Sequence, residues 1–98
     1  VQVRIMSIAT KHNAYVEELA QKMRDLNIRV EADTRNEKIG YKIREAQGQK
    51  IPYMLVVGDK EVEAGAVAIR KRGFGDQGAK NADEFINDLL AEIKNRDM

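Results

Sequence analysis

Residues 35–46, RNEKIGYKIREA, hold the side chains of this sequence that are best suited to binding a ligand. Thr34 followed three residues later by Glu37 has the pattern of a capping box, which predicts that a helix begins there. Basic side chains then lie close to a helix N-terminus, where free N–H groups carry partial positive charge. This combination favours an anionic or acceptor-rich partner, such as a nucleic acid.

The same segment repeats apolar residues at helical spacing. Ile39, Ile43 and Ala46 fall at i, i+4 and i+7, so we expect them on one stripe of the helix. A charged stripe runs beside the apolar one at the same spacing. Its members are Lys38, Lys42 and Glu45, with Arg44 beyond it.

The charge of the chain is uneven along its length. Residues 35–72 contain nine Lys or Arg and five Asp or Glu, a net charge of +4. The remainder contains eight Lys or Arg and eleven Asp or Glu, a net charge of −3. A basic middle in a nearly neutral chain favours a local anionic contact over coating of a duplex. On charge alone, chance clustering on a solvated surface is the alternative.

Length and composition limit the class of protein. The 98 residues, 43% of them hydrophobic, suit one domain with one modest core. The absence of cysteine excludes disulfides and thiolate metal sites, and it fits a reducing compartment. No apolar run is long enough for a transmembrane helix. The chain begins with a strand-like segment that lacks an initiator Met and a visible signal peptide, so we expect a piece of a longer protein.

Apolar runs and turn residues predict the order β-α-β-α-β-β-(β)-α, an α/β fold with helices on both faces of a mixed sheet. Asn13 is the expected cap of the first helix and Asn81, with Glu84, that of the last. The expected strands are residues 1–8, 28–32, 53–57 and 66–70, with a tight connection over 58–65 and a glycine-rich loop, around a short edge strand, over 73–78. The expected core faces of the first and last helices are Val16, Leu19, Ala20 and Met23, and Phe85, Ile86, Leu89, Leu90 and Ile93.

Neither the single histidine nor the glycines indicate an enzyme active site. His12 has no second His, no Cys and no nucleophile pattern beside it, so we expect it to help start the first helix or to face the rest of a larger protein. No GxxxxGK[ST] phosphate loop is present, which argues against ATP binding by this chain.

Three segments, RNEKIGYKIREAQ, IPYMLVVGDKEVEAG and AVAIRKR, resemble the C-terminal anticodon-binding domain of threonyl-tRNA synthetase, a domain type that several class II aminoacyl-tRNA synthetases share. The resemblance covers essentially the whole chain. It implies a single anticodon-binding domain over residues 1–98, with three α/β/α layers and a mixed, mostly parallel five-stranded sheet. Ala66, Ala68 and the glycine-rich residues 73–80 depart from the family pattern.

The resemblance also implies a function. The domain would bind the anticodon arm of threonine tRNA, recognise G and U at the second and third anticodon bases, and pack against the catalytic domain of its parent synthetase. The fragment would be inert in aminoacylation and hold no cofactor, whereas the parent ligase would use ATP, Mg²⁺ and a catalytic-domain Zn²⁺. A cytoplasmic location without a membrane, a monomeric fragment and a homodimeric parent are expected.

The residues that match the family's reading positions are RNA-binding candidates. A carboxylate such as Glu61 accepts from guanine N1–H and N2–H₂, and an Arg fork such as Arg70 binds guanine O6 and N7. An amide such as Asn36 matches the acceptor and donor of uracil. The complete set is Asn36, Lys38, Arg44, Glu61 and Arg70, with Lys71 in a phosphate-facing cluster beside Arg72.

Each candidate has a simpler interpretation. Asn36 could cap the helix, and Lys38 and Arg44 could be solvated helix charges. Glu61 could be a solvated loop carboxylate, and Arg70 could pair with an acidic neighbour. Tyr41 and Tyr53 could stack on bases, although packing in the core or at its edge is favoured. For the whole chain, the alternatives are an accessory module derived from a synthetase that no longer reads an anticodon, and a small flavodoxin-like enzyme or cofactor binder.

Overall fold

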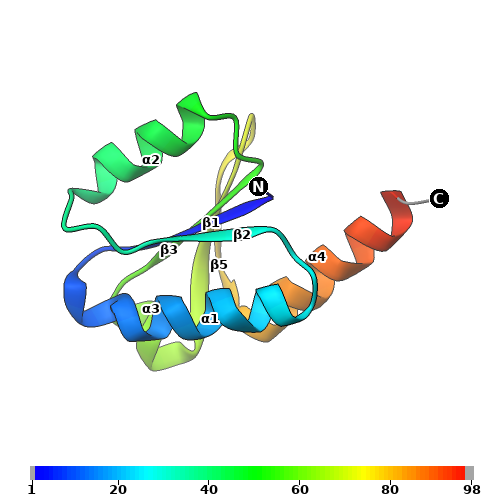
Figure 1. Ribbon diagram of the computed structural model, residues 1–98, viewed down its shortest axis with the longest axis horizontal. Helices are drawn as coiled ribbons and strands as arrows, with labels where there is room; N and C mark the ends of the chain where they lie inside the picture. Colours follow the sequence, from blue (N-terminus) through cyan, green and yellow to red (C-terminus); the bar gives the residue numbers. More distant parts are fainter. Residues whose placement is uncertain (1, 97–98) are drawn as a thin grey trace.

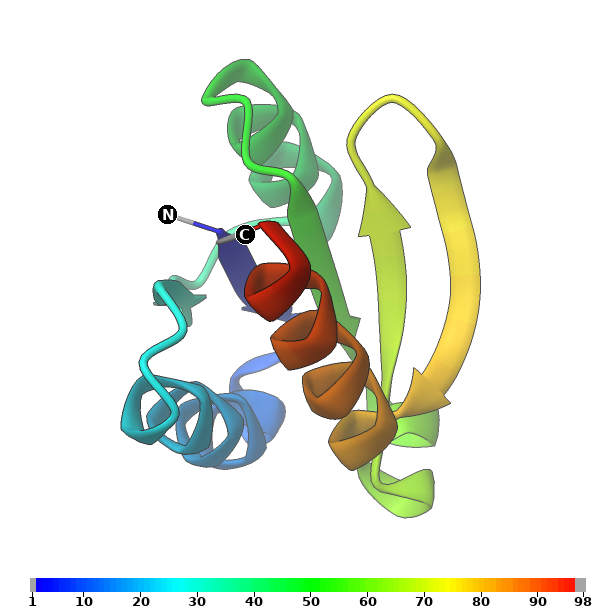
Figure 2. The same ribbon diagram turned by 90° about the vertical axis from the view of Figure 1, so that its right-hand side faces the viewer.

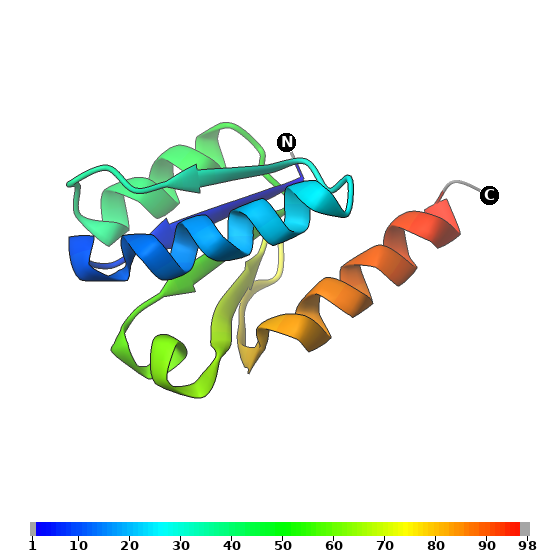
Figure 3. The same cartoon turned by 60° about the horizontal axis from the view of Figure 1, so that its bottom comes forward.

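The computed structural model describes residues 2–96 and has three layers, with a β-sheet between helices (Figure 1). α2 (Ile39–Gly48) lies on one face of the sheet, whereas α1 (Asn13–Asp25) and α4 (Ala82–Arg96) lie on the other (Figure 3). No helix of the described residues has the length and apolar character needed to cross a membrane. The other elements are β1 (Val3–Ser7), the 3₁₀ helix η1 (Thr10–His12), β2 (Val30–Asp33), β3 (Tyr53–Val57), α3 (Asp59–Ala64), β4 (Ala66–Lys71) and β5 (Gly75–Asn81).

The five strands are arranged in the order β2-β1-β3-β4-β5. β1 pairs in parallel with β2 and β3, whereas β4 pairs antiparallel with β3 and β5. The predicted mixed five-stranded sheet is therefore confirmed. Two of its four pairings are parallel and two are antiparallel, because the glycine-rich segment that was expected to form a loop with a short strand supplies the whole of β5.

The larger hydrophobic core lies between the sheet and the pair of helices α1 and α4. Side chains alternate between the faces of a strand, so Leu55 and Val57 of β3 point to this core and are fully buried. The predicted core faces of both helices are confirmed. Val16, Leu19, Ala20, Met23, Phe85, Ile86 and Leu89 are buried, and Leu90 and Ile93 pack against the same core.

A smaller core lies under α2. Met54 of β3 is buried there with Met6, Ala46 and Ile51, and Ile39 and Ile43 pack against them. The predicted apolar stripe of α2 is thus confirmed. α2 lies over β1 and β3, and the β4–β5 hairpin projects beyond it without a helix over that face (Figure 2).

The His12 ring joins the start of the 3₁₀ helix η1 to the start of α3. Its buried ring precedes the first residue of α1, and Nδ1 accepts a hydrogen bond from the backbone N–H of Ala9 at 3.2 Å. Nε2 therefore carries the proton and donates to the carboxylate of Asp59 at 2.7 Å. Bonds from His12 and Lys11 hold the pKa of Asp59 below its usual value. His12 is the N-cap residue of α1, at the helix start as expected, although its side chain makes no cap bond to that helix. Asn13, the predicted cap, is already helical.

Two further connections bear on the predictions. Asn81 caps α4 as expected, because its Oδ1 accepts from the backbone N–H groups of Asp83 at 2.9 Å and Glu84 at 3.3 Å. The connection between β3 and β4 is not a simple tight loop. It forms α3, which ends at Gly65 with a φ of 64°, a left-handed conformation that glycine adopts without strain.

Candidate nucleic-acid interface

The loop that carries Asn36 and Lys38 is not helical, so the predicted helix start at Thr34 is wrong. α2 begins after Lys38, which is its extended N-cap residue. The Asp33 carboxylate holds residue 35 in another arrangement. It accepts from the Arg35 backbone N–H at 3.4 Å and from the Arg35 guanidinium at 2.8 and 2.9 Å. These bonds bend the chain back on β2 before a helix can begin.

Asn36 and Lys38 are exposed at this loop. Within residues 2–96, neither side chain takes part in a hydrogen bond or an ion pair. The helix begins without a side-chain cap bond, so the interpretation of Asn36 as a helix cap is not supported. The Asn36 amide and the Lys38 ammonium are therefore available to a partner from solvent.

α2 has two flanks beside its buried stripe. The flank that faces β2 carries Lys42 and Glu45, since the Glu45 carboxylate lies 3.1 Å from the Arg35 guanidinium. At 3.6 residues per turn, positions 40, 44 and 47 lie on the other flank, toward the uncovered hairpin. Arg44 is exposed on that flank, so the structure places it on the same side as β4 and β5.

A groove of about 220 Å³ opens between α2 and the uncovered part of the sheet. Its walls are largely aliphatic, and its floor is the sheet itself. Ala68, whose small side chain departs from the family pattern, leaves the floor open. The lining residues are Ile8, Ile39, Ile43, Val56, Ala68, Arg70 and Asp76.

Arg70 brings an unmet hydrogen-bonding group to this groove. Its Nε atom is buried and has no hydrogen-bond partner among the described residues. Asp76 lies opposite it in the β4–β5 pairing, yet these two described side chains form no ion pair. A buried N–H without an acceptor costs about 1–3 kcal/mol. An acceptor supplied by a ligand would remove that cost.

Glu61 lies outside the groove, close to its Ile8 wall. Its Oε1 accepts from the Gly58 N–H at 2.7 Å, so the carboxylate is anchored to the start of α3 and is not a mobile loop group. A Cβ added to Gly58 would lie 2.8 Å from Cδ1 of Ile8 and 3.1 Å from this Oε1, which places Ile8, a groove wall, beside Glu61. Met54 of β3 pairs with Arg70, and Gly58 lies four residues after Met54, which is about 13 Å along a strand. Arg70 lines the groove, whereas Glu61 is not one of its lining residues and lies beside the Ile8 wall.

The structure does not bring Lys71 to the groove. Side chains alternate along β4, and Lys71 lies on the α4 face of the sheet. Its ammonium is 5.6 Å from the centre of the Tyr53 ring and 5.1 Å from that of Phe74. Arg72 is exposed in the adjoining turn.

The two tyrosines differ in their surroundings. Tyr53 packs edge-on against Phe85 and donates a hydrogen bond to Glu92 at 2.6 Å, as the packing interpretation predicted. Tyr41 is half-exposed, with the Arg35 guanidinium 5.8 Å from its ring centre. In the part of the chain that the structure describes, no group of three or more His, Asp or Glu side chains could hold a metal ion.

Sequence reasoning missed three contributors to the site. Ile8 read as the end of a buried strand, but it is 47% exposed and lines the groove. Asp76 lay in a segment expected to be a loop. Lys42 read as part of a charged stripe, but it is buried. The many acidic and basic residues between positions 33 and 45 were the sequence signal that could have indicated the burial of Lys42.

Comparison with known proteins finds a matching family. Residues 2–92 match the family described as the anticodon binding domain. Over 96 residues, or 98% of the chain, the sequence is 58% identical to threonine–tRNA ligase from Carboxydothermus hydrogenoformans and 55% identical to that from Desulforamulus reducens. The chain spans 15% of the length of each of these relatives.

The fold is also similar to a solved structure. The RNA binding domain of threonyl-tRNA synthetase from Cryptosporidium parvum Iowa II superposes with a TM-score of 0.86 and 26% sequence identity. The match covers 92% of this chain and 23% of that one.

Proposed function

Because the chain belongs to the anticodon-binding domain family, we propose that it reads the anticodon loop of threonine tRNA as one domain of a longer threonine–tRNA ligase. The observation that carries the proposal is the groove beside α2, which ends in the unpartnered Nε of Arg70. ATP, Mg²⁺ and Zn²⁺ would belong to the catalytic part of that ligase, which would act in the cytoplasm as a homodimer.

The groove suits one unstacked base. A base on the floor formed by Ala68 would contact the aliphatic walls with its faces or edge. Arg70 in the groove would donate to guanine O6 and N7, and Glu61 beyond the Ile8 wall would accept from N1–H and N2–H₂. Glu61 Oε1 already accepts from Gly58, but a carboxylate oxygen has two lone pairs and can accept again. This arrangement selects G at the second anticodon position.

The loop before α2 suits the next base. The Asn36 amide offers one donor and one acceptor, which match the acceptor and donor of uracil at the third position. Lys38 is exposed at the start of α2 and Arg44 on the helix flank toward the hairpin, where they would contact uracil oxygens or phosphates. Single-stranded loops are the form of RNA in which such base edges are accessible.

The test is binding of anticodon stem-loops with G or A at the second position, measured by fluorescence anisotropy. We expect the wild type to prefer G. Arg70→Met should lose about 1–3 kcal/mol on the G loop and much less on the A loop. Arg72→Met makes the same chemical change on the exposed turn and should weaken both loops equally or not at all. Equal binding of both loops by the wild type, or equal losses in Arg70→Met, would refute the proposed function.

A further inference from the structure

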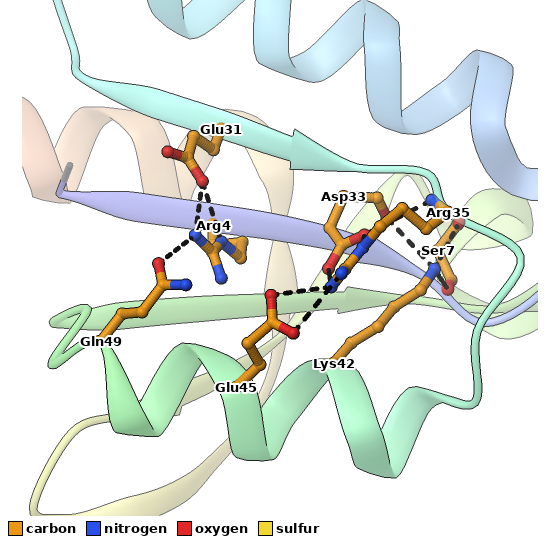
Figure 4. Close-up of polar contacts among 8 residues, drawn as sticks. All are labelled: Arg4, Ser7, Glu31, Asp33, Arg35, Lys42, Glu45 and Gln49. Atoms are coloured by element: carbon orange, nitrogen blue, oxygen red, sulfur yellow. Dashed lines mark hydrogen bonds and ion pairs between the residues drawn. The ribbon is translucent and has the colours of Figure 1, made fainter.

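Lys42 is a buried charge with no direct part in the proposed base reading. Only 1% of the residue is exposed, and its ammonium lies among three oxygens at the ends of two strands (Figure 4). Nζ donates to the backbone carbonyl of Ser7 at 2.9 Å and to that of Asp33 at 3.2 Å, and it lies 3.4 Å from the Ser7 hydroxyl. The side chain therefore joins α2 to the ends of β1 and β2.

Packing alone does not explain a lysine at this position. Burial lowers the pKa of Lys42, and the ammonium lies near the N-terminus of α2, where the helix dipole disfavours a cation. An apolar side chain of similar length would fill the space without either cost. What the ammonium supplies is a set of directed bonds to backbone carbonyls.

The Lys42 bond to the Asp33 carbonyl holds the residue that immediately precedes the loop of residues 34–38. Asp33 is the last residue of β2, and its carboxylate binds the Arg35 guanidinium, which also binds Glu45 on α2. The Arg35 carbonyl in turn accepts from the Glu37 N–H at 2.9 Å. The Lys38 carbonyl accepts from the Lys42 backbone N–H at 3.1 Å, so the backbone of the loop is fixed at both ends.

The side chains of the same loop are left open. Asn36 and Lys38 point into solvent, and no bond within the described chain restrains either of them. A fixed backbone with unrestrained polar side chains is the arrangement expected of a preorganised reading loop, since ordering a flexible loop on binding lowers affinity.

We infer that Lys42 is a positioning residue: through Asp33 and Arg35 it fixes loop 34–38 so that Asn36 presents its amide to the third anticodon base. The inference rests on the proposed function. Under this inference, Lys42 affects recognition of the third anticodon base and not of the second. Arg70 and Glu61, which would recognise the second base, are carried by β4 and α3, and Lys42 forms no hydrogen bond with the described residues of either element.

The first test needs no RNA. Amide hydrogen exchange of Arg35 and Glu37, whose N–H groups are hydrogen-bonded at the loop, should become at least about tenfold faster in Lys42→Met than in the wild type. Leu89→Ala on α4 is the control, because it loosens the opposite core without touching the loop. If Lys42→Met does not fold, Arg35→Gln, an exposed change in the same chain of contacts, must loosen the same loop. Unchanged exchange in the folded variant tested would overturn the inference.

The second test uses anticodon stem-loops with U or C at the third position and G or A at the second. The preference for U should fall about tenfold in Lys42→Met, since the loop must then be ordered on binding. The preference for G should change less than twofold. Equal losses of both preferences, or retention of the preference for U, would overturn the inference. A wild type that shows neither preference would refute the proposed function instead, and the exchange result would still stand.

Discussion

Arg70 should stabilise a bound base at the expense of the free fold. Its buried Nε lacks an acceptor among the described residues, and such a group costs about 1–3 kcal/mol. Met keeps an unbranched apolar stem and removes the guanidinium. We therefore expect Arg70→Met to raise the free energy of unfolding by about 1 kcal/mol. For a domain of this size, that corresponds to an increase in melting temperature of roughly 4–8 °C.

Thermal unfolding followed by circular dichroism, without RNA, measures this effect. Arg72→Met is the matched control, since an exposed side chain in a turn should change stability by no more than about 0.5 kcal/mol. A gain in stability together with a loss of RNA affinity would identify a functional residue that destabilises the fold. If Arg70→Met melted several degrees below the wild type, the guanidinium would be stabilising the fold and the reasoning about its unmet bond would fail.

Three further predictions follow from the same structure. Ile43→Asp should lower the free energy of unfolding, measured by urea titration, by about 2–4 kcal/mol, because Ile43 packs on the smaller core. Arg44→Asp, an exposed change at the next residue, should have little effect in that titration. Arg35 holds the pKa of Asp33 below its usual value, so the unfolded chain binds more protons than the folded chain below about pH 4. The free energy of unfolding should therefore fall as the pH drops through that range, and it should fall less steeply in Asp33→Asn. Equal slopes in the two proteins would show that Asp33 does not contribute to the acid response. The logarithm of RNA affinity should fall modestly and linearly with the logarithm of salt concentration, and Lys71→Ala should reduce that slope for every anticodon only if Lys71 contacts phosphate.

Local patterns were sufficient to predict most of the elements. The run at residues 53–57 is a strand with the predicted bounds, and α1 begins and ends within a residue of its prediction. These segments have strong apolar periodicity and clear turn residues at their ends. The glycines of β5 concealed a strand, because an edge strand with no buried side chain lacks the alternating pattern that identifies one.

The site was harder to predict because tertiary bonds override local signals there. Thr34 and Glu37 have the pattern of a helix start, but Asp33 binds Arg35 and delays the helix. Lys42 occupies a helix stripe that reads as solvated, and only the meeting of two strand ends supplies the carbonyls that bury it. Spacing within one segment contains no information about either partner.

Chemical-shift mapping of the ¹⁵N-labelled chain with a threonine anticodon stem-loop tests the central claim most directly. The groove predicts the largest shifts at Ile8, Ala68 and Arg70 and in loop 34–38, with the Arg70 side-chain Nε–H signal moving downfield as it gains an acceptor. Shifts confined to Lys71, the hairpin turn and α4 would place the RNA on the opposite face of the sheet and contradict the account.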